Sequence, residues 1–158
     1  MAAEHSRFLE LAIELATRNV DERAGGPFGA VIVRQGEVIA TGANSVTATN
    51  DPTAHAEVVA IRNACRELKT FQLEGCDVYA SCEPCPMCLA AIYWARARAV
   101  YYANTKADAA AAGFDDSLIY NEIALPPERR SLGMVHLPMK TAQESFARWQ
   151  ASQMRVDY

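Results

Sequence analysis

The sequence of 158 residues has no apolar run that approaches the roughly 20 residues needed to cross a bilayer. Its first residues include the charged Glu4 and Arg7, so they do not form the apolar centre of a secretory signal. Internal repeats and low-complexity linkers are also absent, and the length suits one compact core. We therefore expect a single cytoplasmic domain, residues 1–158, with no membrane partner.

Basic residues are also not in excess. The chain has 15 Lys and Arg against 19 Asp and Glu, and its formal net charge is −4. Proteins that bind along the phosphate backbone of a nucleic acid carry a long basic groove. The negative net charge of the chain does not indicate such a groove. We therefore do not expect a nucleic-acid partner.

The spacing of apolar residues predicts helices and strands in alternation. A helix from Ser6 to about Asn19 precedes a β-hairpin formed by residues 30–33 and 38–40. Later segments extend the pattern, with strands at 77–82, 99–103 and 134–137 and helices at 86–95, 106–112 and 141–154. Strands that alternate with helices in this way predict an α/β fold with a mixed five-stranded sheet and helices on both faces.

One expected helix begins at a His-x-Glu motif. Asp51 is a predicted N-cap with Pro52 as the first helical residue, which places His55 and Glu57 near the helix start. Residues two apart lie about 200° apart around a helix axis, so they cannot share a ligand on its flank. They can share one that lies beyond the helix N-terminus.

The next expected helix begins at a Cys-x-x-Cys motif. Cys85 and Cys88 lie on one side of its first turn, where the positive end of the helix favours thiolates. We therefore predict one Zn²⁺ per subunit between two helix N-termini, held by His55, Cys85 and Cys88. Three such ligands leave tetrahedral zinc one open position, at which water becomes a nucleophile near neutral pH. Glu57, which is not a ligand, would then carry the proton.

Other sites also use a Cys-x-x-Cys pair. A structural zinc site needs a fourth ligand, but His5 and His136 lack such a setting and Cys82 could serve only from a strand end. An iron–sulfur cluster needs a fourth thiolate, for which Cys65 and Cys76 are poorly spaced. A thioredoxin-like redox pair leaves the His-x-Glu motif without a role. The alternative outside the enzymes is a zinc-stabilised binding module, which would gain nothing from an uncoordinated carboxylate.

Four stretches carry a family resemblance, namely residues 25–31, 50–57, 82–88 and 113–117. On them the chain resembles the cytidine deaminase-like superfamily and, within it, the bacterial guanine deaminases. The second and third stretches are similar in tRNA adenosine deaminases and yeast-type cytosine deaminases, so they indicate the chemistry better than the base. The last stretch and Tyr158 favour guanine.

The resemblance implies a fold, an assembly and a reaction. The fold is a three-layer α/β/α sandwich, and the assembly is a homodimer. The reaction is the hydrolytic deamination of guanine to xanthine and ammonia in purine catabolism or salvage, with zinc hydroxide attacking C2. In this family the C-terminal segment can close the active site of the neighbouring subunit. We expect the same of Phe146–Tyr158, within a segment of about residues 141–158 that is swapped onto the partner.

The purine also needs protein groups that recognise it. Asp116 could accept hydrogen bonds from N1–H and the 2-amino group of guanine and assist proton movement to the departing ammonia. Asn44, at a strand end, offers a donor and an acceptor. Further expected contacts are the side chains of Phe28, Trp94 and Tyr158 and the backbone N–H of Ala56.

Two other activities remain open from sequence. Guanosine or another aminated heterocycle is an alternative substrate, because a sequence does not show the depth of a pocket. A tRNA adenosine deaminase would need a basic surface around the pocket and would bind RNA with a strong dependence on salt. The acidic balance of the chain and the Asp115-Asp116 pair count against it.

Overall fold

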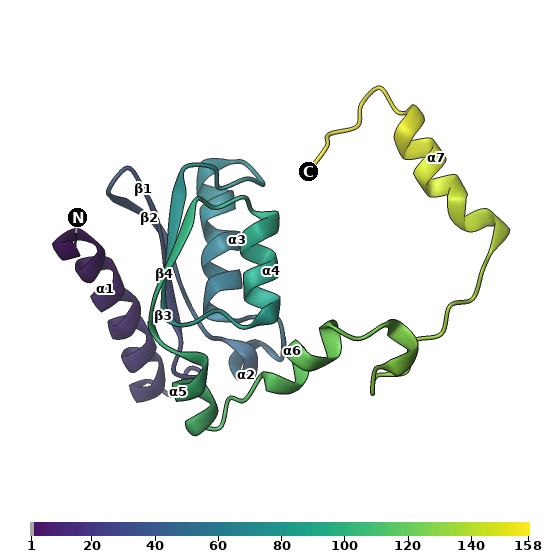
Figure 1. Cartoon of the computed structure of the whole chain (residues 1–158). Helices are drawn as coiled ribbons and strands as arrows, with labels where there is room; N and C mark the ends of the chain where they lie inside the picture. The colour runs from purple at the N-terminus through teal and green to yellow at the C-terminus, as the bar shows by residue number, and fades with distance from the viewer. Residues whose placement is uncertain (1) are drawn as a thin grey trace. The chain divides into compact units, whose positions relative to one another are not determined.

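The structure is a computed structural model that describes residues 2–158, with side chains described from residue 5 onward. The chain divides into two compact units, Met1–Asp116 and Ser117–Tyr158 (Figure 1). Within the part of the chain that is described, no helix is long and apolar enough to cross a membrane.

The first unit is built on a mixed sheet of four strands in the order β2-β1-β3-β4. Strand β1 (Gly29–Arg34) pairs antiparallel with β2 (Glu37–Ala43) and with β3 (Cys76–Cys82). Strand β4 (Ala99–Asn104) pairs parallel with β3. The expectation of an α/β fold with a mixed sheet is therefore confirmed.

Helices cover both faces of this sheet (Figure 1). Helix α1 (Ala2–Asp21) packs on one face, where Phe8 and Leu15 contact Val31 and Tyr79. Helices α3 (Ala56–Leu68) and α4 (Pro86–Trp94) pack on the other face, against alternate residues of the same strands such as Ile32. Because successive side chains of a strand point to opposite faces, one apolar strand serves two cores.

Two predicted helix starts are wrong. The helix expected from Ser6 already begins at Ala2, so Ser6 lies within α1. Asp51 does not cap α3; its carboxylate accepts hydrogen bonds from the N–H and the hydroxyl of Thr53, at 2.8 and 2.7 Å. An aspartate that bonds the backbone two residues ahead forms a turn instead of a helix cap. That turn follows the short helix α2 (Val46–Thr49), and α3 begins five residues after Asp51, at Ala56.

A glycine lets α3 lie close to the sheet. A side chain on Gly42 of β2 would collide with the backbone of Ala56 and Ala60 in α3. The first turn of α3 therefore rests directly on the sheet backbone, and this contact determines where the His-x-Glu motif lies.

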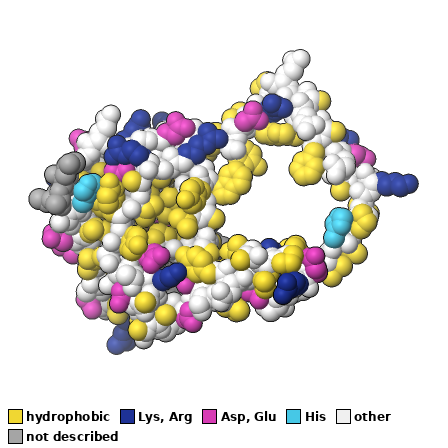
Figure 2. Space-filling view, viewed as in Figure 1, with side chains coloured by type: hydrophobic (Ala, Val, Ile, Leu, Met, Phe, Trp, Pro, Cys, Tyr) yellow, Lys and Arg dark blue, Asp and Glu magenta, His cyan; other side chains and the backbone are white. Residues whose placement is uncertain are grey.

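Helix α5 (Lys106–Ala111) follows β4 and completes the first unit. The second unit contains α6 (Ser117–Ile123), two 3₁₀ turns (Pro127–Arg129 and Lys140–Ala142) and α7 (Gln143–Ala151). Its described residues include no buried one. Figure 2 shows hydrophobic side chains on its surface, and among them are Ile123, Leu132, Val135, Leu137, Phe146 and Trp149.

The fifth strand that was expected at residues 134–137 is absent, since no described residue of that segment pairs in a sheet. Its apolar run is a local property, whereas a strand exists only where a neighbouring strand supplies hydrogen bonds. The prediction of a five-stranded sheet is therefore wrong.

Candidate metal centre

One edge of the sheet collects the chain segments that carry the candidate site. In the strand register Gly29 lies opposite Ala43, and Cys82 lies opposite Asn104. The start of β1 and the ends of β2, β3 and β4 therefore share this edge. Because each candidate residue of the first unit other than Trp94 lies in a segment that adjoins it, residues distant in sequence can meet there.

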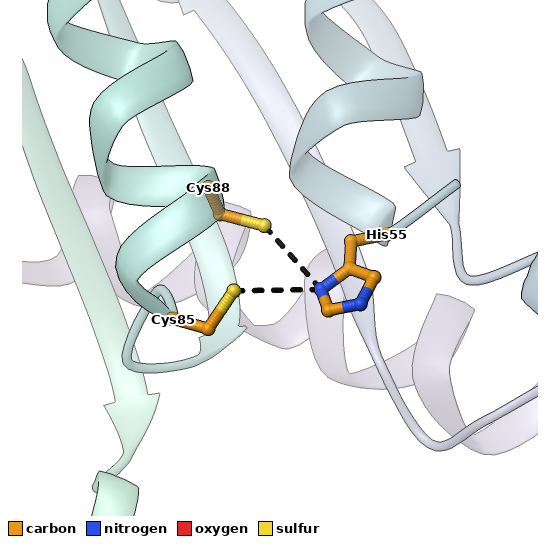
Figure 3. Close-up of side chains that lie close together, drawn as sticks. All are labelled: His55, Cys85 and Cys88. Carbon is orange, nitrogen blue, oxygen red and sulfur yellow. Dashed lines mark hydrogen bonds between the residues drawn. The ribbon is translucent and has the colours of Figure 1, made fainter. Parts of the chain in front are cut away.

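Three candidate zinc ligands meet between two helix starts (Figure 3). His55 is the N-cap of α3, Cys85 is the N-cap of α4, and Cys88 lies in the first turn of α4. Nδ1 of His55 lies 3.5 Å from Sγ of Cys85 and 3.5 Å from Sγ of Cys88. All three ligand atoms lie within 4.8 Å of one another.

These separations fit a tetrahedral zinc ion. Zinc with a Zn–N distance of about 2.0 Å and Zn–S distances of about 2.3 Å holds its nitrogen and sulfur ligands about 3.5 Å apart. That is the distance from Nδ1 of His55 to each sulfur. A donor set of one imidazole and two thiols is also one that zinc prefers.

The two thiols differ in acidity. A hydrogen bond from the Cys88 thiol, helped by one from His55, lowers the pKa of Cys85 to about 4. The pKa of Cys88 is raised, because its thiol donates that hydrogen bond and because it is buried. Cys85 is therefore the thiolate that is ready for a cation, and metal binding would release the proton of Cys88.

Glu57 lies beside the cluster but points its carboxylate at a sulfur. It is the second residue of α3 and only 7% exposed, and its Oε2 lies 3.4 Å from Sγ of Cys88, where it competes with Cys85 for the one thiol proton. Burial raises the pKa of this carboxyl above its ordinary value. A buried carboxyl with a raised pKa, next to three metal-ligand types, is suited to taking up and returning a proton.

Asn44 follows β2 and is buried, and its side-chain oxygen is already engaged. This oxygen accepts hydrogen bonds from the backbone N–H groups of Gly26 and Val46, each at 3.3 Å. Asn19 of α1 donates to the carbonyls of Gly26 and Asn44, each at 2.8 Å, and so ties the same turn to α1. The Asn44 oxygen thus has two partners within the chain, which leaves the donors of its NH₂ group for a ligand.

The segment after α5 approaches the site through an aromatic contact that sequence reasoning missed. The Phe114 ring meets the Phe28 ring edge-on, with centroids 4.9 Å apart. Asp116 is half-buried, and its pKa is raised first by burial and then by the negative charge of Cys85. The sequence could have indicated Phe114, because it lies between Gly113, which ends the helix, and Asp116.

The remaining predicted contacts with the base are Ala56, Trp94 and Tyr158. Ala56 is buried and is the first residue of α3, where backbone N–H groups have no helical partner. Trp94 is exposed at the C-terminal end of α4, away from the end that carries Cys85. Tyr158 is exposed in the second unit, where its ring lies edge-on to Trp149 with centroids 6.4 Å apart. Within one chain the structure therefore does not bring Trp94 to the cluster.

Comparison with known proteins gives this arrangement a family. The zinc-binding region of cytidine and deoxycytidylate deaminases matches residues 2–104, a range that contains the whole His/Cys/Cys cluster. The chain therefore belongs to this family of zinc-binding deaminases.

Its similarity to one member extends beyond that region. The chain is 52% identical to the guanine deaminase of Bacillus subtilis (strain 168) over 154 residues, which cover 98% of the chain and 99% of that relative. The crystal structure of the Bacillus subtilis guanine deaminase superimposes with a TM-score of 0.96 over 98% of both chains. The resemblance to bacterial guanine deaminases is thereby confirmed.

Other relatives match a smaller part of the chain. A guanine deaminase structure from Nitrosomonas europaea has 33% identity and a TM-score of 0.66, and the match covers 70% of the chain and 64% of that structure. The tRNA-specific adenosine deaminase of Agrobacterium fabrum is 48% identical over 100 residues, which cover 63% of the chain and 65% of that relative.

Proposed function

We propose that this protein catalyses the hydrolytic deamination of guanine to xanthine and ammonia. The observation that carries the reaction class is the buried Glu57 carboxylate, held against Cys88 beside a His/Cys/Cys donor set. Support for guanine comes from the extent of the similarity. The guanine deaminase of Bacillus subtilis is matched over 154 residues, whereas the tRNA-specific deaminase of Agrobacterium fabrum is matched over 100.

In this proposal His55, Cys85 and Cys88 hold one zinc ion in each chain. The two helix N-termini on which they stand favour the thiolate form of the cysteines. A bound zinc ion supplies an activated water molecule near neutral pH. Reduced thiols are required for this, so we place the protein in a reducing compartment such as the cytoplasm.

Glu57 moves the protons in this proposal. Its carboxylate takes one proton from the attacking water and delivers it to a ring nitrogen. It then takes the second proton from the hydroxyl group added at C2 and delivers it to the departing amine. Burial, which raises its pKa, makes the protonated form accessible during turnover. The reaction consumes one water molecule, replaces the 2-amino group by an oxygen and releases ammonia.

The residues at the sheet edge would orient the base. Asp116 accepts hydrogen bonds from N1–H and the 2-amino group, and it assists proton movement to ammonia. Asn44 donates to an acceptor of the purine edge, because its own oxygen is occupied. The rings of Phe28 and Phe114 are available to stack on the base, and the N–H of Ala56 is available to a ring carbonyl.

The second unit supports a proposal of a homodimer. Its helices bury no described residue, although apolar side chains are frequent in them. A segment with no core of its own cannot offset the entropy of ordering, so a second surface must stabilise it. We propose that residues 141–158 pack on a second copy of the chain. Tyr158 would then contact the purine that is bound in the other subunit.

The main alternative activity is deamination of adenosine in tRNA. Its support is the match to the Agrobacterium fabrum enzyme. The test is ammonia release by zinc-loaded protein from guanine, guanosine, adenine, cytosine, cytidine and an adenosine-containing anticodon stem-loop. We expect turnover of free guanine that exceeds turnover of every other substrate. Turnover of guanosine at the same rate would show an open pocket, and preference for the stem-loop would replace this proposal by the tRNA reaction.

A further inference from the structure

Two chain connections leave the same sheet edge and carry different parts of the site. The connection from β3 to α4 carries Cys85, and the connection from β4 leads through α5 to Asp116. The distance between Cys85 and Asp116 therefore depends on how these two connections are joined.

Hydrogen bonds between described residues join them, and three of these bonds bear on the position of α5. The N–H of Glu83 donates to the carbonyl of Asn104 at 2.8 Å, and Sγ of Cys82 donates to the carbonyl of Thr105 at 3.5 Å. The third bond uses a side-chain carboxylate, because the N–H of Lys106 donates to Oε2 of Glu83 at 3.0 Å. Only this third bond can be removed by substitution without altering the backbone or a thiol.

Glu83 satisfies a donor at the start of α5 that the helix cannot satisfy itself. The capping box of α5 pairs Thr105 with Asp108, which occupies the N–H groups of those two residues. Lys106 is the first helical residue, and its N–H has no helical acceptor. A carboxylate at this position is also favoured by the helix dipole.

Helix α5 depends on such end contacts, because it buries none of its described side chains. A helix of six residues is not stable by itself, so its attachments decide its position. At its far end the N–H of Phe114 closes on the carbonyl of Ala109 at 2.9 Å, and the Phe114 ring rests on Phe28. At the near end, Glu83 and Cys82 supply the side-chain attachments, and that of Glu83 is the shorter of the two, at 3.0 against 3.5 Å.

We propose that Glu83 is a positioning residue, which ties the start of α5 to the connection that carries Cys85 and thereby determines where Asp116 lies. This inference rests on the proposed function, because Asp116 is assigned to guanine there. Glu83 acts through Asp116 and takes no part in proton transfer or metal binding.

The test compares Glu83→Ala with Glu83→Gln in the zinc-loaded, full-length protein. The alanine variant loses the hydrogen bond and is expected to lose about 10-fold in kcat/KM for guanine, with its zinc content unchanged. The glutamine variant keeps an oxygen that can accept from Lys106, so its kcat/KM should stay within about 3-fold of wild type. Glu74→Ala, which removes an exposed carboxylate paired with Arg96, is the control for loss of charge and should match wild type.

A double variant then tests the route through Asp116. In the Asp116→Ala background, Glu83→Ala should lower kcat/KM by less than about 3-fold, because the group that it positions is gone. An unchanged 10-fold loss in that background would overturn the proposal. Equal loss in the alanine and glutamine variants, or loss of zinc from the alanine variant, would do the same. If wild type instead deaminates another base of the panel, the proposed function fails, and the same variants are compared on that base.

Discussion

Glu57 combines two properties that ordinarily exclude each other in a protein. It is a carboxylate, and it is 7% exposed, with the Cys88 sulfur as its hydrogen-bond partner. Burial of a charged group without an opposite charge is costly, and a natural sequence keeps such a group where chemistry needs it. This carboxylate lies beside the His55, Cys85 and Cys88 donor set, where a proton carrier is needed.

We therefore predict that Glu57→Gln keeps zinc and fold but loses at least about 1000-fold in guanine turnover. Glutamine has the same shape as glutamate, but it cannot carry a proton. Zinc content, circular dichroism and ammonia release test this together. Turnover near the wild-type rate would contradict the role of Glu57 as proton carrier.

Asp116 is expected to recognise the two adjacent donors of guanine. Asp116→Asn replaces one acceptor oxygen by an NH₂ group, which would meet a donor of the base. We expect a loss of about 100-fold or more in kcat/KM for guanine with zinc content unchanged, because a buried donor of the base would lose its acceptor. Asp115→Asn makes the same change of charge one residue away and should stay within about 3-fold. Equal effects of the two substitutions would contradict the assignment.

The dependence of kcat/KM on pH below neutrality offers a second test of the role of Asp116. Its pKa is raised, first by burial, so the carboxylate form is lost at a higher pH than for an exposed aspartate. The kcat/KM for guanine should therefore fall as pH decreases through this raised pKa. Profiles of wild type and Asp116→Asn, compared over the same pH range, should differ on this limb. Identical acid limbs would show that another group titrates there.

Helix α3 owes its position to one small residue of the sheet. A methyl group on Gly42 would meet three backbone atoms of Ala56 and Ala60, and none of them belongs to a flexible side chain. We expect Gly42→Ala to lower the free energy of unfolding by about 1–3 kcal/mol and to displace the helix start that carries His55. Denaturant unfolding measures the first effect, and zinc affinity measures the second.

Gly133 provides the control for this substitution. A side chain added there meets nothing within 4 Å. Gly133→Ala should therefore change the free energy of unfolding by less than about 1 kcal/mol. If both substitutions had the same effect, close approach of α3 would not be the reason for glycine at position 42.

The C-terminal segment, residues 141–158, is proposed to close the active site of a second copy. If it closes the site of a second copy, a chain that ends at Val156 should lose at least about 10-fold in guanine turnover, because Tyr158 is gone. Sedimentation should still show a dimer, since most of the segment remains. Full activity of this truncated chain would argue against a role for the last two residues.

A mixing experiment shows whether the segment acts on its own chain or on its partner. The truncated chain retains Glu57, and the Glu57→Gln chain retains Tyr158. In a mixed dimer with exchanged segments, one site has both, so an equal mixture should recover about a quarter of wild-type activity. If each segment closes its own site, no mixed dimer has a complete site, and mixing should restore nothing.

Local patterns in the sequence determine the donor set and the elements that carry it. His55, Cys85 and Cys88 were expected at two helix starts, and the structure brings them together there. Proline at the first position of α4 and the spacing of the cysteines act within one helical turn, so no distant residue is needed to interpret them. For the same reason the two-residue gap between His55 and Glu57 predicted a ligand beyond the end of their helix.

Tertiary structure decided the features that depend on distant partners. Asp51 forms a turn with Thr53, so α3 starts at Ala56, where it lies on Gly42 of another element. Residues 134–137 have an apolar pattern but no neighbouring strand, and the described sheet therefore has four strands.

The orientation of Asn44 and the meeting of Phe28 with Phe114 likewise join segments that are far apart in sequence. The sequence by itself determined the chemistry, because metal ligands are identified by residue type and local spacing. The structure determined which side-chain atoms are already engaged within the chain, because that depends on the partners that the rest of the fold supplies.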